Sequence, residues 1–128
     1  MAAMSDYLED EILDHILRNA AFTSPSAVYL GLSTGTFGDD NSGTELTGNN
    51  YSRVAVTFDP ASGGATDNTG AIEFAAATGT WGSVGFFGLF DASSAGNLLI
   101  HGALASAKTI QSGDILKINA GDLDITID

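Results

Sequence analysis

The spacing of hydrophobic residues changes once along the chain, near Pro25. Before that proline, apolar residues recur every three or four positions, at Leu8, Ile12, Leu13, Ile16, Leu17 and Ala20. This spacing predicts an amphipathic helix over residues 6–20. Ser5 or Asp6 can cap its start, and acidic residues fill its first turns, where the helix dipole favours negative charge. We expect the turn-forming residues 23–25 to end the helix.

After Pro25 the apolar residues alternate with polar or small ones, as in strands with one buried face. Clear examples are residues 28–32, 53–58 and 123–127, and clusters rich in Gly, Asn, Asp and Ser separate such runs. Seven or eight short strands with this punctuation predict a mainly β fold. We expect a single β-sandwich or jelly-roll-like domain over residues 5–128, preceded by an N-terminal extension of residues 1–4.

The run from residue 81 to residue 90 differs because it is apolar on both parities. Its two sets are Val84, Phe86 and Phe90 on one side, and Trp81, Phe87 and Leu89 on the other. A strand of this kind must be covered on both faces. One face would meet the sandwich core, and the apolar face of the helix is the preferred cover for the second. A contact with another subunit is the alternative, since buried aromatic residues often anchor interfaces.

The segment from Thr34 to Asn50 is long for a loop and holds few apolar residues. Loops of this length are often functional or mobile, although an ordinary exposed loop is an equal alternative. Asp39, Asn41 and Glu45 have the alternate-residue oxygen spacing of calcium-binding loops, but the twelfth-position glutamate of such loops is missing. We therefore predict no metal or cofactor, and keep these three residues as a weak calcium candidate.

Composition excludes several classes of function. The chain has no cysteine, which rules out disulfides and thiolate metal sites. Only 4 basic residues stand against 16 acidic ones, a formal charge of −12, so we expect no nucleic-acid partner. No apolar run is long enough to cross a membrane, and the acidic N-terminus does not resemble a signal peptide. With 44% hydrophobic residues, the chain should nevertheless fold.

Candidate catalytic groups are few. The two histidines, His15 and His101, lie in the predicted helix and in a predicted strand. The chain contains neither a G-x-S-x-G nucleophile motif nor a phosphate-binding glycine motif. Most acidic residues fall in the helix or in turns, where solvation explains them. The sequence therefore predicts a protein that is not an enzyme.

A set of helix, turn and strand-start motifs runs along nearly the whole chain from about Ser5. It comprises Tyr7-Leu8-Glu9, His15 to Asn19, Phe22 to Pro25, Val28 to Leu32, Gly43-Thr44-Glu45, Tyr51 to Phe58, Gly88 to Ala92, Gly96 to Leu99, Gly102-Ala103-Leu104, Ser112-Gly113-Asp114 and Ala120-Gly121. Together these motifs resemble small virion structural proteins of tailed bacteriophages, a family of tail-fibre-like and capsid decoration-like β-sandwich proteins. The resemblance implies a component of the particle surface, made in the cytoplasm of the bacterial host.

Within that family the short chain, which has no repetitive shaft, favours a capsid decoration or cement protein. We expect it to form a homo-oligomer, as a trimer, and to bind the major capsid protein or tail proteins. The expected contacts are the helix and the aromatic strand, through Leu8, Ile12, Ile16, Trp81, Phe86, Phe87 and Phe90. The long loop would add Phe37, Asp39, Asp40, Asn41 and Tyr51. The alternative is a tail-fibre or baseplate-associated protein, including a carbohydrate-binding module that uses the same loop.

Overall fold

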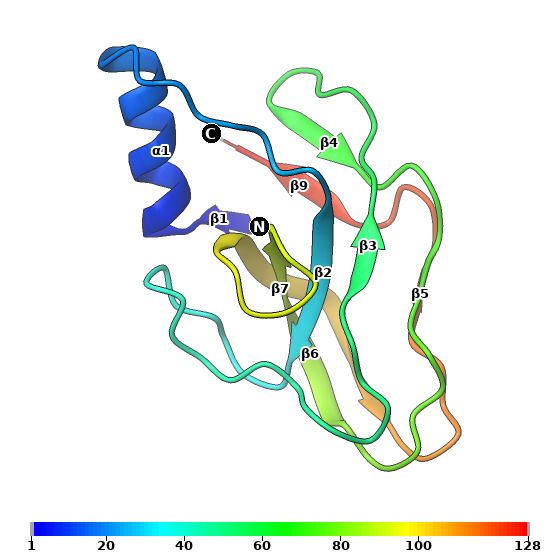
Figure 1. The fold of residues 1–128 in the computed structure, drawn as a ribbon. Helices are drawn as coiled ribbons and strands as arrows, with labels where there is room; N and C mark the ends of the chain where they lie inside the picture. Colours follow the sequence, from blue (N-terminus) through cyan, green and yellow to red (C-terminus); the bar gives the residue numbers. More distant parts are fainter. Residues whose placement is uncertain (1, 128) are drawn as a thin grey trace.

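The computed structural model describes residues 2–127, which form mostly strands with one N-terminal helix (Figure 1). Met1 and Asp128, at the ends of the predicted extension and domain, lie outside the described residues. In chain order the elements are β1 (Ala2–Met4), α1 (Asp6–Leu17), β2 (Val28–Ser33), β3 (Val54–Val56), β4 (Ala65–Asp67), β5 (Ile72–Glu73), β6 (Gly82–Phe90), β7 (Leu98–Ile110), β8 (Lys117–Ile118) and β9 (Asp124–Thr126).

The strands form two layers around one main core. Five of them make an antiparallel sheet in the order β1-β7-β6-β2-β3, while β4 pairs with β9 and β5 pairs with β8. Apolar side chains of the large sheet pack against those of the two small sheets and their flanking turns. The buried members include Leu30, Leu32, Val84, Phe87 and Leu89 on one side, and Ile72, Phe74, Leu116, Leu123 and Ile125 on the other. The predicted mainly β fold with an N-terminal helix is confirmed.

The helix begins where the sequence indicates but ends earlier. Ser5 is the N-cap, and its side chain accepts a hydrogen bond from the backbone N–H of Leu8. At the other end Asn19 has a φ of 58°, and the N–H groups of Arg18 and Ala20 both donate to the carbonyl of Asp14. The predicted helix over residues 6–20 therefore extends three residues too far, because the left-handed conformation at Asn19 already turns the chain out of the helix.

Residues 2–4, predicted to form an extension before the domain, instead add an edge strand to the large sheet. In β1, Ala2 lies opposite Gly102 and Met4 lies opposite Ile100. The next residue, Ser5, is buried, and its backbone N–H donates to the carbonyl of Leu99. The chain before the helix is thus part of the domain and fixes where the helix starts.

The aromatic strand β6 does not keep the strict alternation that its sequence suggests. Val84 pairs with Lys108 but Phe86 pairs with Ala103, so Gly85 alone lies opposite the four residues 104–107 of β7. This irregularity shifts the parity, and Val84, Phe87 and Leu89 all belong to the main core. The predicted grouping of Val84 with Phe86 and Phe90 was wrong for that reason.

Candidate interaction surfaces

The second face of β6 is covered by the long loop, and the predicted cover by the helix was wrong. Phe90 packs with Phe37 of the loop and with Leu98 in a small separate cluster, all three buried. The rings of Phe37 and Phe90 meet edge to face, with their centroids 5.8 Å apart. Gly88 leaves the space for this cluster, since a Cβ atom there would lie 2.9 Å from both Leu98 and Phe90.

Arg53 and Glu45 hold the base of the same loop against the sheet. The guanidinium contacts both carboxylate oxygens, with Nη2 2.8 Å from Oε1 and Nε 2.9 Å from Oε2. It also lies 3.6 Å above the centre of the Phe90 ring. Nη1 donates to the carbonyls of Ala92 and Ala95 at 2.8 Å, which ties in the β6–β7 turn. We call this ion pair and its partners the Arg53 clasp.

Tyr51 joins the Arg53 clasp to the end of β2 that lies beyond its pairing with β3. Its hydroxyl donates to Oε2 of Glu45 at 2.6 Å and accepts from the backbone N–H of Leu32 at 2.9 Å. Burial, followed by the hydrogen bond to Glu45, raises the pKa of Tyr51 above its ordinary value. Its ring stacks on Phe74 and meets Trp81 edge to face. Tyr51 therefore contacts both the core and the loop, and only part of its side chain is accessible to a partner.

The tip of the loop reaches the start of the helix. Oδ1 of Asp39 lies 2.7 Å from Nε2 of His101 on β7, and the carbonyl of Asp39 accepts a hydrogen bond from the N–H of Asp6. Asp40 is exposed and accepts from the N–H of Ser42, and hydrogen bonds with Ser42 lower the pKa of Asp40. The exposed Asn41 has a φ of 63°. The segment 34–50 is thus a loop packed against the sheet and the start of the helix.

The calcium candidates are engaged with different partners. Glu45 binds Arg53 and Tyr51, whereas Asp39 lies against His101. Among residues 2–127, no three acidic or histidine side chains gather as a metal ion would require. Oxygen ligands arranged around one point are what calcium needs, and the loop uses these carboxylates in other contacts.

The most exposed apolar surface lies on α1. None of its residues is buried, and Ile12, Leu13, Ile16 and Leu17 are 37%, 54%, 63% and 71% exposed. Leu8 is half-buried and lines a small apolar groove with Val28, Phe58, Leu89, Leu99, Ile100 and Ile125. In Figure 1 the helix stands beside the β layers rather than over the sheet. The predicted contacts Ile12 and Ile16 are therefore available to a partner.

The other predicted aromatic contacts are less accessible. Trp81, Phe87, Phe90 and Phe37 are each at most 5% exposed, so they are part of the interior and cannot form an external contact in this fold. Phe86 and Tyr51 are half-buried. The main core and the long loop cover the two faces of β6, where the sequence predicted the core and the helix.

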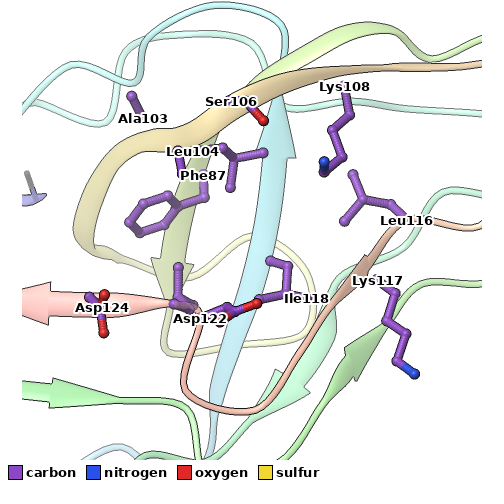
Figure 2. A pocket seen from close by; sticks show the side chains of 12 residues that line it. Phe87, Ala103, Leu104, Ser106, Lys108, Leu116, Lys117, Ile118, Asp122 and Asp124 are labelled. Carbon is purple, nitrogen blue, oxygen red and sulfur yellow. The ribbon is translucent and has the colours of Figure 1, made fainter.

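The sequence did not indicate a pocket of about 450 Å³ between β7 and the turns around β8 and β9. Figure 2 shows Leu104, Ser106 and Lys108 on β7 above it, with Ile118, Asp122 and Asp124 below. Its apolar floor includes Phe87, Leu116 and Leu123. A volume of this size can accept several side chains. Lys108 and Lys117 in apolar strands were the signal that could have drawn attention to it.

The described residues show little that would support catalysis. His101 has a carboxylate partner in Asp39, but no hydroxyl side chain forms a hydrogen bond to it within residues 2–127. A Ser–His–Asp arrangement needs that third group within hydrogen-bond reach of the imidazole.

No described helix is long and apolar enough to span a membrane.

Comparison with known proteins gives a family. Residues 3–126 match the family described as Podophage GP4 fiber I protein gp80. A search of curated proteins found no match. Because the family match spans almost the whole chain, this chain belongs to that family of phage virion structural proteins.

Proposed function

We propose that this member of the podophage fibre I family is a non-enzymatic structural subunit of a virion fibre, assembled from several copies of the chain. The observation that carries the proposal is the match over residues 3–126 to a family whose description names a fibre protein. Capsid decoration stays a prediction, and the family description favours the tail-fibre alternative over it.

Two physical features support a structural role. The acidic exterior, with a formal charge of −12, keeps many copies from adhering to DNA or to one another without specificity. The exposed apolar residues of α1 give one localised surface for a specific contact. A carbohydrate-binding role has less support, since Phe37 is buried and Tyr51, the other aromatic residue proposed for the loop, is half-buried.

Labelling of intact particles tests the proposal. A peptide tag after Ile127, which is exposed, would be detected with gold-labelled antibody on phage particles by electron microscopy. We expect gold on the fibres of the particle. Gold distributed over the head would overturn the fibre assignment and support capsid decoration. A tag inserted in the exposed turn at residues 61–64 serves as a second label, in case a neighbouring subunit covers the first tag in the particle.

A further inference from the structure

The exposed face of α1 carries a two-part pattern. Ile12, Leu13, Ile16 and Leu17 form its apolar part. Glu9 lies three and four positions before Ile12 and Leu13, so it stands on the same side of the helix, one turn toward the N-terminus. Asp10, exposed like Glu9, flanks it there. The surface that a partner would meet is therefore acidic at its N-terminal half and apolar at its C-terminal half.

The pocket beside β7 carries the complementary pattern. Its floor is apolar, and Lys108 and Lys117 are two of only four basic residues in the chain. Neither lysine forms an ion pair within residues 2–127, although Lys117 lies opposite Glu73 in the β5–β8 pairing. In Figure 2 the two lysines lie at one side of the pocket, and Asp122 and Asp124 lie at the other.

We propose that the pocket beside β7 receives helix α1 of a second copy of this chain. Ile12, Ile16 and their neighbours would cover the apolar floor, while Glu9 and Asp10 would approach Lys108 and Lys117. The apolar side chains of the helix then meet the apolar floor and its acidic side chains meet lysines, while the acidic side of the pocket faces the end of the helix that carries Arg18. The proposal deepens the fibre function and rests on it for the expectation of several copies.

The helix of the same chain cannot fill this pocket. The backbone N–H of Ser5 is bonded to Leu99, and the side chain of Ser5 is bonded to Leu98, which places α1 at the start of β7. The pocket lies farther along the strand, at residues 103–108, and no residue of α1 lines it. Two different surfaces on each copy make a head-to-tail contact, which generates a closed ring or an extended filament. Either outcome suits a fibre.

Light scattering coupled to size-exclusion chromatography of the purified chain tests the contact. We expect concentration-dependent oligomers that Ile16→Asp or Lys108→Glu disperses, each raising the apparent dissociation constant about tenfold or more. Thr109→Glu, on the neighbouring exposed residue of β7 outside the pocket, is the matched control and should leave assembly intact. Circular dichroism checks that each variant is folded.

Mixing the two dispersed variants tests the head-to-tail geometry. The Ile16→Asp chain keeps a working pocket and the Lys108→Glu chain keeps a working helix, so the mixture should form dimers and nothing larger. A symmetric contact through one surface, helix on helix or pocket on pocket, would not produce this result. A wild-type chain that is monomeric at all concentrations, or oligomers that neither variant disperses, would overturn the inference.

Cysteine cross-linking gives an independent measurement, because the chain has no cysteine of its own. A mixture of Leu13→Cys and Ser106→Cys chains should yield a cross-linked heterodimer under mild oxidation. The pair Leu13→Cys and Ser62→Cys, with the second cysteine in a remote exposed turn, should not. Fibre labelling of particles can succeed while both of these experiments fail, so failure of the inference and failure of the proposed function are distinguishable.

Discussion

The long loop and the N-terminal helix differ in burial, in the opposite sense to what their compositions suggest. The loop 34–50 is polar, yet it buries Phe37 and places Glu45 in the Arg53 clasp. The helix carries a continuous apolar stripe, yet none of its residues is buried. An apolar side chain is buried only where the rest of the chain supplies a surface for it, and the face of β6 that the helix could have covered is already occupied by the loop.

The largest effect is expected in the Arg53 clasp. Arg53→Ala would leave the partly buried Glu45 carboxylate without its cation and remove the cover from Phe90, at a cost of about 3 kcal/mol in the free energy of unfolding. Urea denaturation measures this difference. Arg53→Lys should lose less unfolding free energy, because it keeps the positive charge. It should still be less stable than wild type, because it loses the bidentate contact with Glu45. A loss below about 0.5 kcal/mol for Arg53→Ala would show that the loop does not depend on the clasp.

A cavity created under the loop should lower the free energy of unfolding slightly less than Arg53→Ala does. Phe37→Ala removes one ring of the edge-to-face pair with Phe90, and we expect a loss of about 2–3 kcal/mol in the free energy of unfolding. Limited proteolysis should also detect faster cleavage within residues 34–50. Phe37→Leu, which retains most of the volume, is the control. Equal stability of Phe37→Ala and wild type would contradict the packed position of the loop.

The β6–β7 turn should lose stability in acid. Burial alone would raise the pKa of Asp91, but the backbone and side-chain hydrogen bonds from Asn97 outweigh it and lower the pKa. The lowered pKa means that the stabilisation is complete above the ordinary value of 3.8 and is lost as the pH falls through the folded-state pKa. We expect Asp91→Asn to cost about 1 kcal/mol at pH 7.

Urea denaturation of wild type and Asp91→Asn at several pH values measures this difference. The two proteins should converge in unfolding free energy as the pH falls well below 3.8. A difference between them that stays constant across this pH range would contradict the assignment.

The smallest effect on the isolated monomer is expected in the helix. Leu17→Ser should change the free energy of unfolding by less than about 0.5 kcal/mol, because the side chain is 71% exposed. The measurement is best made at a concentration where the chain is monomeric. A loss above about 1 kcal/mol would mean that α1 packs on its own domain, and the contrast between helix and loop would disappear.

The predicted contact residues differ in how much of their placement the sequence could give. Ile12 and Ile16 could be placed on one face of the helix from the sequence, since helical spacing is local. Their exposure depends on the contacts of Ser5 with β7, which anchor the helix. Trp81 and Phe90 could not be excluded from the sequence. Trp81 meets the ring of Tyr51, and Phe90 meets the ring of Phe37, which lie far away in the chain. The pocket beside β7 brings together residues from three separate segments, and no short motif marks it.

The sequence by itself determined what depends on neighbouring residues: the start of the helix at Ser5, the alternation of the strands, the acidic exterior and the family membership. Tertiary structure alone decided the rest. The shifted parity at Gly85 follows from the register of β6 on β7. Either the helix or the loop could have covered Phe90, and the structure shows that the loop does. That outcome depends on contacts between distant segments, which the local pattern of polar and apolar residues does not contain.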